Sequence, residues 1–125
     1  MTVVMEAPDA AALVEYEMSA LPVEHLRVIN LDTRNRVINI ENIYVGSLNA
    51  STVRVGELFK PAIQRNAASI IVLHNHPSGD CEPSHEDIVL TNRLDESGKI
   101  LGIRVLDHII IGDGVYFSFK EEGLI

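Results

Sequence analysis

A small group of residues near the middle of the chain has the types and spacing that suit metal chemistry: His74, His76, Ser84 and Asp87. Alternate residues of a strand project from the same face, so His74 and His76 would place two imidazoles side by side. Pro77 keeps His76 extended, because the residue before a proline avoids the helical conformation. Both rings would therefore lie at the end of the apolar strand that precedes them.

The carboxylate completes this set. Asp87 falls in the first turn of a helix expected to begin near Ser84, and it can face back toward the strand end. Two imidazoles and one carboxylate leave the fourth position of a tetrahedral zinc open for water. Zinc lowers the pKa of that water to about 7, so hydroxide becomes available at neutral pH. We therefore predict a hydrolase-type zinc site with His74, His76 and Asp87 as its protein ligands.

Each of these signals also has an ordinary structural interpretation. His-x-His occurs on many strands, and Ser84 with Asp87 matches a capping box in which Ser84 is the N-cap. Ser84 could donate to a developing oxyanion, serve only as a cap, or do both through different atoms. The combination of these residues after an apolar strand, with Pro77 and Gly79 between them, favours the metal site.

The elements that must position these residues follow from the hydrophobic pattern. Helices are predicted over residues 9–19, 56–66 and 84–101, and strands over residues 25–31, 37–45, 68–73, 103–111 and 115–119. On the longest helix, the residues expected on the inner face are Ile88, Thr91, Leu94 and Leu101, and Gly98 is expected to loosen the last turn. The order α-β-β-α-β-α-β-β predicts an α/β fold, a mixed β-sheet flanked by helices.

Length and composition limit the function. At 125 residues, 46% of them hydrophobic, one core can form without disulfides or a metal, so a metal would serve chemistry rather than folding. A formal net charge of −8 makes direct nucleic-acid binding by this domain unexpected. The single cysteine, and the lack of a signal peptide or a long apolar stretch, predict a cytoplasmic protein that does not contact membranes.

The spacing around the two histidines resembles a known signature. His-x-His, seven residues, Ser84, two residues and Asp87 is similar to the JAMM motif of MPN-type metalloproteases. The surrounding HNHPSGDCEPSHED, with LDHIIIG at residues 106–112, resembles more closely the RadC family of bacteria. The likeness extends from about Val23 to the end of the chain.

This resemblance implies a zinc-dependent metallohydrolase of the peptidase or isopeptidase type, in the three-layer MPN/JAMM architecture that is like that of cytidine deaminases. His74, His76 and Asp87 would bind Zn²⁺, and Ser84 would support the tetrahedral intermediate. The substrate would be a protein or peptide, and the family often cleaves next to ubiquitin-like folds.

The resemblance also sets an expected domain organisation. We expect an N-terminal helical segment, residues 1–22, packed on a JAMM/MPN-like domain of residues 23–125. RadC proteins commonly carry an N-terminal helix-hairpin-helix region associated with DNA binding. This chain begins almost at the metalloprotease-like domain, so we expect no such region here and either a short family member or part of a longer one.

The family's general base is a glutamate on an earlier strand, and Glu41 is the best match. It lies within VINIENIYV, on a strand face expected to include Val37, Ile43 and Val45. A carboxylate on an apolar strand is costly unless it is paired or functional. Burial would raise its pKa toward the range useful for moving a proton from water. The alternative is a glutamate at a strand end that reaches solvent.

Other ionisable residues near the motif are weaker candidates. Three glutamates are expected in capping or solvated positions: Glu57, Glu82 and Glu86. Asp107 and His108 alternate on an apolar strand, so one should point inward, and an inward Asp107 could accept a hydrogen bond from a ligand imidazole. A satisfied buried polar pair is an equal alternative. Cys81 could touch the metal, but a passive thiol in a turn is favoured.

Three other functions stay open on the sequence alone. A DNA-repair-associated accessory or DNA-processing protein would use the metal differently, and the acidic composition argues against it. Two histidines and a carboxylate also form the triad of iron(II) oxygenases. A binding module could keep the metal without turnover. Cytidine-type deaminases need a Pro-Cys-x-x-Cys pair that this chain lacks, and the letters HNH do not indicate the nuclease fold of that name.

Overall fold

The structure, a computed structural model, describes residues 2–49 and 51–125. In these ranges the elements, in chain order, are α1 Ala7–Met18, β1 His25–Leu31, β2 Val37–Val45, α2 Val55–Gln64, β3 Ser69–Asn75, α3 His85–Leu101, β4 Arg104–Ile111 and β5 Tyr116–Ser118. The predicted order is confirmed, and every predicted boundary lies within two residues of an observed one.

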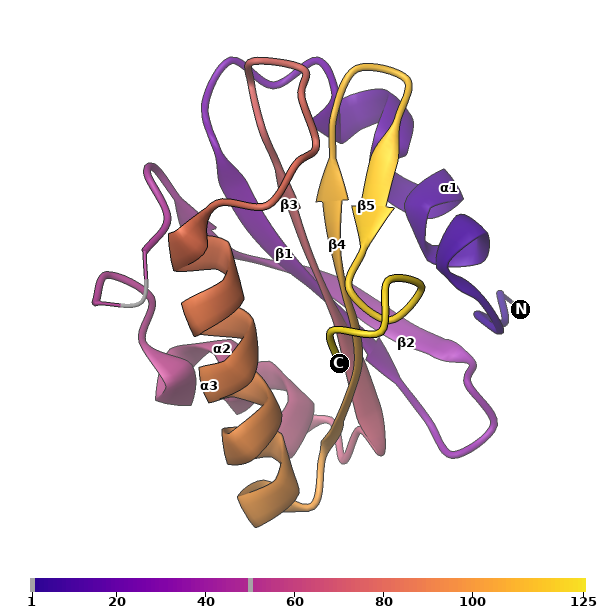
Figure 1. Ribbon diagram of the computed structural model, residues 1–125. Coiled ribbons are helices and arrows are strands. Elements are labelled where there is room, and N and C mark those ends of the chain that lie inside the picture. Colours follow the sequence, from indigo (N-terminus) through magenta and orange to yellow (C-terminus); the bar gives the residue numbers. More distant parts are fainter. Residues whose placement is uncertain (1, 50) are drawn as a thin grey trace.

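The five strands form one mixed sheet in the order β2-β1-β3-β4-β5 (Figure 1). β3 and β4 are parallel and are joined by α3, whereas the other three neighbouring pairs are antiparallel. All seven residues of β3 are buried, as its continuous apolar sequence predicts for a strand covered on both faces. The histidine motif therefore begins on the central strand of the sheet.

Helices cover both faces of the sheet, so the predicted three-layer α/β architecture is confirmed. α1 packs on one face, where Val14 and Met18 meet Ile29, Ile71 and Ile109. α2 and α3 pack on the opposite face, over the second apolar cluster. The main residues of that cluster are Leu26, Val28, Leu58, Phe59, Ile70, Val72, Leu90, Leu94 and Val105.

The inner face of α3 differs from the prediction in one respect. Ile88 and Leu101 are 37% and 46% exposed, and the buried residues of the helix are Asp87, Leu90, Thr91, Leu94 and Gly98. The buried face of the helix includes Asp87, and a pattern of apolar residues does not predict that a carboxylate points inward. The inner face of α3 therefore presents Asp87 to the sheet.

Gly98 has a packing role rather than the loosening role expected of it. α3 continues through Gly98 to Leu101 and ends at Gly102, whose φ of 73° forms a left-handed C-cap. A Cβ atom on Gly98 would lie 2.4 Å from the carbonyl oxygen of Ile103. The missing side chain therefore lets the helix approach the start of β4.

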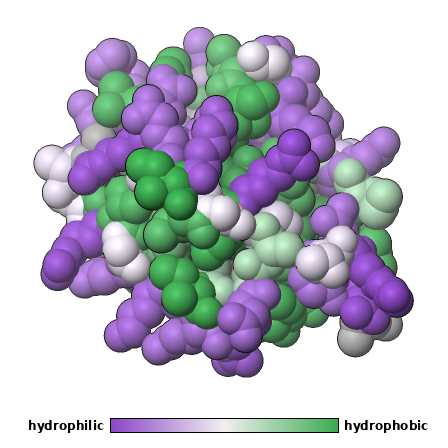
Figure 2. Space-filling view, turned by 90° about the horizontal axis from the view of Figure 1, so that it is seen from below, coloured by the Kyte–Doolittle hydropathy of each residue, from purple (hydrophilic) through white to green (hydrophobic). Residues whose placement is uncertain are grey.

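The histidine motif and the face seen in Figure 2 lie at opposite ends of the sheet. Figure 2 views the molecule from below Figure 1 and shows apolar side chains near the centre of that face, surrounded by hydrophilic ones. The carboxyl end of β3 and the start of α3 lie at the opposite end (Figure 1).

Within the described ranges, no helix has the length and apolar character needed to cross a membrane.

Candidate metal centre

His74 and His76 lie at the carboxyl end of β3, as the alternation predicts. His74 is the sixth residue of the strand and is fully buried. His76 follows the strand, and its backbone N–H donates to the carbonyl oxygen of Ile111 at the end of β4 at 2.9 Å. Gly79 turns the following loop with a φ of 90°, and its carbonyl oxygen accepts from the backbone of Asp113 at 2.9 Å. The loop that carries His76 is thus tied to the β4–β5 turn.

Asp87 is positioned by the first turn of α3. Ser84 is the N-cap, and its Oγ accepts from the Asp87 backbone N–H at 3.1 Å. The Asp87 Oδ2 atom accepts in return from the Ser84 backbone N–H at 2.8 Å. The capping box is therefore present, and it directs the Asp87 carboxylate toward the end of β3 instead of excluding a role in the site.

The three side chains converge on one point. His74 Nε2 lies 3.1 Å from His76 Nε2, and each of these atoms lies 3.1 to 3.2 Å from an oxygen of the Asp87 carboxylate. Two nitrogens bound to tetrahedral zinc at about 2.0 to 2.1 Å would be about 3.3 Å apart. Among the described residues these three form the group of potential ligands that could hold a metal ion.

The donor chemistry of this group suits a metal ion. His76 Nδ1 lies 2.9 Å from the carbonyl oxygen of Asp80, which can only accept, so Nδ1 carries the proton and Nε2 presents a lone pair. His74 Nδ1 is likewise engaged, at 2.7 Å from His108 Nε2. Lone pairs and a carboxylate facing one another are stable only with a proton or a metal ion between them, so the residues fit a zinc ion.

The pKa values follow from the same contacts. In the metal-free protein Asp87 raises the pKa of His76 above its usual range, because the carboxylate accepts a hydrogen bond from Nε2–H of the protonated ring, although burial lowers this pKa. Burial by itself would raise the pKa of the Asp87 carboxyl, but the hydrogen bonds that it accepts from the imidazoles in their protonated form and from the Ser84 backbone outweigh burial. The pKa of Asp87 is therefore held far below its usual range, and the carboxylate is ionised at neutral pH.

His108, and not Asp107, contacts the imidazole of a predicted ligand. His108 is fully buried on β4 and contacts both His74 and the Thr91 Oγ1 atom, the latter at 2.6 Å. Asp107 is on the opposite face, where it accepts from the hydroxyl of Ser118 and from the backbone of Lys120. The expectation that one member of the pair faces the site is met by His108, and Asp107 is a satisfied buried acid whose pKa is raised by burial.

Glu41 lies on the same face of the sheet as His74 but not within the cluster. It pairs with Val28 of β1, which in turn pairs with Val72 of β3, so its Cα is about 12 Å from that of His74 from the strand spacings. Its half-buried carboxylate accepts from the Asn39 side chain at 2.6 Å. The structure thus places Glu41 two strands away from His74 on the same face, and the hydrogen bond of its carboxylate is with Asn39 and not with the three predicted ligands.

The residues that lie on the same face of β2 as Glu41 differ from those predicted. Two register shifts in the pairing of β2 with β1 interrupt the strict alternation. Val37 and Val45 pair with Leu31 and His25, and both lie on the opposite face from Glu41. Ile43 packs against the same apolar cluster as Val28, so only this part of the predicted face is retained.

The remaining candidates lie outside the ligand group. Cys81 is half-buried in the loop and is absent from the set of converging ligands among the described residues. Glu57 is exposed and pairs with Arg54 at 3.2 Å. Glu82 and Glu86 are exposed. The three glutamates are thus exposed, as expected, and Cys81 lies in the loop where a passive thiol was favoured.

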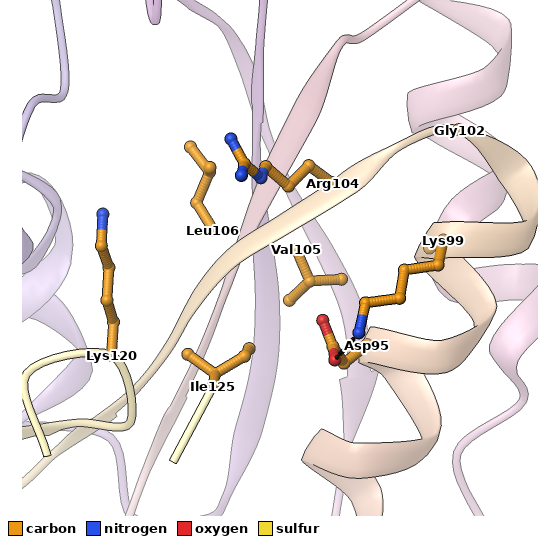
Figure 3. Close-up of a pocket in the computed structure, with 9 residues that line it drawn as sticks. Asp95, Lys99, Gly102, Arg104, Val105, Leu106, Lys120 and Ile125 are labelled. Atoms are coloured by element: carbon orange, nitrogen blue, oxygen red, sulfur yellow. Dashed lines mark ion pairs between the residues drawn. The ribbon is translucent and has the colours of Figure 1, made fainter. Parts of the chain in front are cut away.

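A pocket of about 640 Å³ lies elsewhere, at the carboxyl end of α3. Its lining includes Lys99, Arg104 and Lys120, and Lys99 pairs with Asp95 at 3.1 Å (Figure 3). Val105 and Ile125 contribute apolar surface to it. This pocket holds none of the converging imidazoles or the buried carboxylate, so it is separate from the candidate metal centre.

The sequence is similar to those of known proteins over most of its length. The model of the RadC-like JAB domain family matches residues 4–124. The chain is 60% identical over 116 residues to a UPF0758 protein of Roseiflexus castenholzii, an alignment that covers 93% of this chain and 50% of that protein. It is 55% identical over 123 residues to a UPF0758 protein of Desulfitobacterium hafniense, which covers 98% of this chain and 54% of the relative. The chain thus spans about half the length of these curated relatives, and it belongs to the RadC-like JAB domain family.

Proposed function

We propose that this domain is a zinc-dependent metallohydrolase of the peptidase or isopeptidase type. The observation that carries the proposal is the convergence of His74 Nε2, His76 Nε2 and the Asp87 carboxylate within 3.2 Å of one another. Two fixed Nδ1 contacts leave both Nε2 lone pairs facing that carboxylate. Three protein ligands with a further position open are typical of catalytic zinc, whereas structural zinc sites are closed by four.

A zinc ion held by these side chains would supply Lewis acidity, which polarises a carbonyl group and acidifies a water molecule. The chain's own residues would do the rest. Glu41, on the same face of the sheet, would take the proton of the attacking water and deliver it to the leaving amine. Its half-buried carboxylate already accepts one hydrogen bond from Asn39, which would orient it for this task.

Ser84 would serve both the helix and the reaction. Its Oγ accepts from the backbone of Asp87, which leaves the hydroxyl proton free to donate to a developing oxyanion. Ser84 is exposed, and the side chain of His76 is 15% exposed, whereas that of His74 is fully buried. A substrate would therefore approach from the side of Ser84 and His76.

The proposed substrate is a protein or peptide, with ubiquitin-like proteins as the first class to test, and the proposed compartment is the cytoplasm. The main alternative is a DNA-repair-associated or DNA-processing role in which the metal serves another purpose. The net charge of −8 favours the proteolytic role, because duplex DNA attracts basic surfaces.

Cleavage of peptide and isopeptide substrates by zinc-loaded protein tests this proposal. Glu41→Gln should keep the metal and lose at least 10²-fold in rate, the range typical for loss of a general base. Glu57→Gln is the matched control, because Glu57 is an exposed glutamate paired with Arg54, and it should keep wild-type activity. Retention of full activity in Glu41→Gln would remove Glu41 from the mechanism. Salt-sensitive DNA binding or cleavage without any peptidase activity would favour the alternative role.

A further inference from the structure

A chain of buried hydrogen bonds runs behind the metal ligands and connects β3, β4 and α3. His74 Nδ1 lies 2.7 Å from His108 Nε2, and His108 Nδ1 lies 2.6 Å from Thr91 Oγ1. Thr91 then donates to the backbone carbonyl oxygen of Asp87 at 2.8 Å. The exposed fractions of these four residues are all 3% or less, so these hydrogen bonds are shielded from bulk water. The chain begins at one ligand and ends at the backbone of another.

The donor and acceptor roles in this series of hydrogen bonds follow from its last bond, between Thr91 and Asp87. A carbonyl oxygen can only accept, so the single hydroxyl proton of Thr91 is committed to Asp87, in the back-bonding geometry common for threonine in helices. Thr91 Oγ1 must then accept from His108 Nδ1–H. A neutral His108 with its proton on Nδ1 presents a lone pair on Nε2, which accepts from His74 Nδ1–H. His74 Nε2 is left as a lone pair that faces the metal position.

We propose that Thr91 and His108 are positioning residues that hold His74 in the tautomer that binds the metal. With the opposite direction, Thr91 would donate to His108 Nδ1, and His108 Nε2–H would donate to His74 Nδ1. The proton of His74 would then lie on Nε2, where the metal must bind. Thr91 lies one helical turn beyond Asp87, so the same helix that supplies a ligand also sets the tautomer of another ligand.

Ring packing supports the same assignment. His108 stacks on Phe119, with ring centroids 4.9 Å apart and an interplanar angle of 8°, which fixes the orientation of the imidazole. Its two nitrogens are therefore held toward His74 and Thr91 at once. Orientation of a ligand imidazole by a buried partner is typically worth 10- to 100-fold in metal affinity.

This inference rests on the proposed metal site but not on hydrolysis, so its test uses zinc affinity measured by competition with a chelator. His108→Leu removes both contacts and should weaken zinc binding about 10- to 100-fold. His108→Gln is the matched variant, because its amide oxygen can accept from His74 while its amide N–H donates to Thr91. We expect His108→Gln to bind zinc several-fold more tightly than His108→Leu. Thermal unfolding with a chelator present verifies that both variants are folded.

A second pair of variants keeps the test independent of how His108→Leu folds. Thr91→Val has nearly the same shape but lacks the hydroxyl, whereas Thr91→Ser retains it. Thr91→Val should lose zinc affinity and Thr91→Ser should keep it. In metal-free wild-type protein, nitrogen-15 NMR should show the His108 proton on Nδ1, and Thr91→Val should show a mixture of tautomers.

The outcomes separate the two proposals. Weaker zinc binding in His108→Leu and Thr91→Val, with recovery in His108→Gln and Thr91→Ser, supports the positioning role whatever the substrate. Equal zinc affinity in all four variants, or a His108 proton on Nε2 in the wild type, overturns the positioning role while leaving the metal site intact. Absence of zinc binding by the wild type overturns both.

Discussion

Replacing Ser84 separates the two roles that its position allows. In Ser84→Ala the backbone N–H of Asp87 loses the Oγ acceptor that it reaches at 3.1 Å, so one donor at the start of α3 is left to solvent. Loss of a serine N-cap costs about 1 kcal/mol of the free energy of unfolding. For a chain of 125 residues this should lower the melting temperature by roughly 3 to 6 °C, measured with a chelator present.

Two matched variants distinguish the cap from the hydroxyl donor. Aspartate is as good an N-cap as serine but has no proton to donate at neutral pH, so Ser84→Asp should retain stability. Threonine keeps both properties. If Ser84 donates to the oxyanion, Ser84→Ala and Ser84→Asp should both lose about 10²- to 10³-fold in kcat with zinc bound, and Ser84→Thr should retain most activity.

Either of two results would contradict these roles of Ser84. An unchanged melting temperature in Ser84→Ala would show that the observed capping bond adds no stability. Wild-type turnover in Ser84→Asp, with zinc content verified, would show that the hydroxyl proton has no part in the reaction and that Ser84 is only a cap.

The packing of α3 and the side chains near the candidate metal centre lead to three more expected outcomes. Gly98→Ala should destabilise the fold by roughly 1 to 3 kcal/mol, because the new Cβ would lie 2.4 Å from the Ile103 carbonyl oxygen. Alanine stabilises an ordinary helix interior relative to glycine, so a gain in stability would contradict this close contact. In metal-free protein Asp87 raises the pKa of His76 above 6.5. The protonated imidazole of His76 therefore adds fully to the free energy of unfolding below pH 6.5, and this stabilisation is lost as the pH rises through the pKa of the folded protein. Zinc affinity should rise over the same pH interval, because the metal competes with the proton for the imidazole. Urea titrations from about pH 5 to 9 measure the stability change, and zinc titrations over the same range measure the affinity. His76→Gln should lack the stability change. Cys81→Ser should leave the zinc content unchanged, since Cys81 is outside the ligand group of the described residues; loss of zinc would make the thiol a ligand.

The convergence of the three candidate ligands could be predicted from the sequence because each position depends on local geometry. His74 and His76 share a face because strand side chains alternate, and Asp87 is fixed by its place three residues after the N-cap. The order of helices and strands was equally predictable, because periodic apolar segments and turn residues are short-range signals.

The partners of the ligands could not be predicted, because they meet across separate elements. Thr91 and His108 lie 17 residues apart, and their contact depends on how α3 packs over β4. The sequence carries one signal for Thr91, its spacing of four residues from Asp87, which places both on one helix face. The choice between Asp107 and His108 depends on the parallel register of β3 and β4, which shifts between Ile70 and Ile71.

The metal content of purified, untagged protein tests the proposed zinc site most directly. Wild type should contain about one zinc per chain, and His76→Ala and Asp87→Ala should contain almost none. His85→Ala is the matched control, because His85 is an exposed histidine at the start of the same helix, and it should keep the zinc. Iron in place of zinc would contradict the hydrolytic assignment and direct attention to oxygen chemistry. A wild-type protein that takes up no metal even after zinc is added back would contradict the account as a whole.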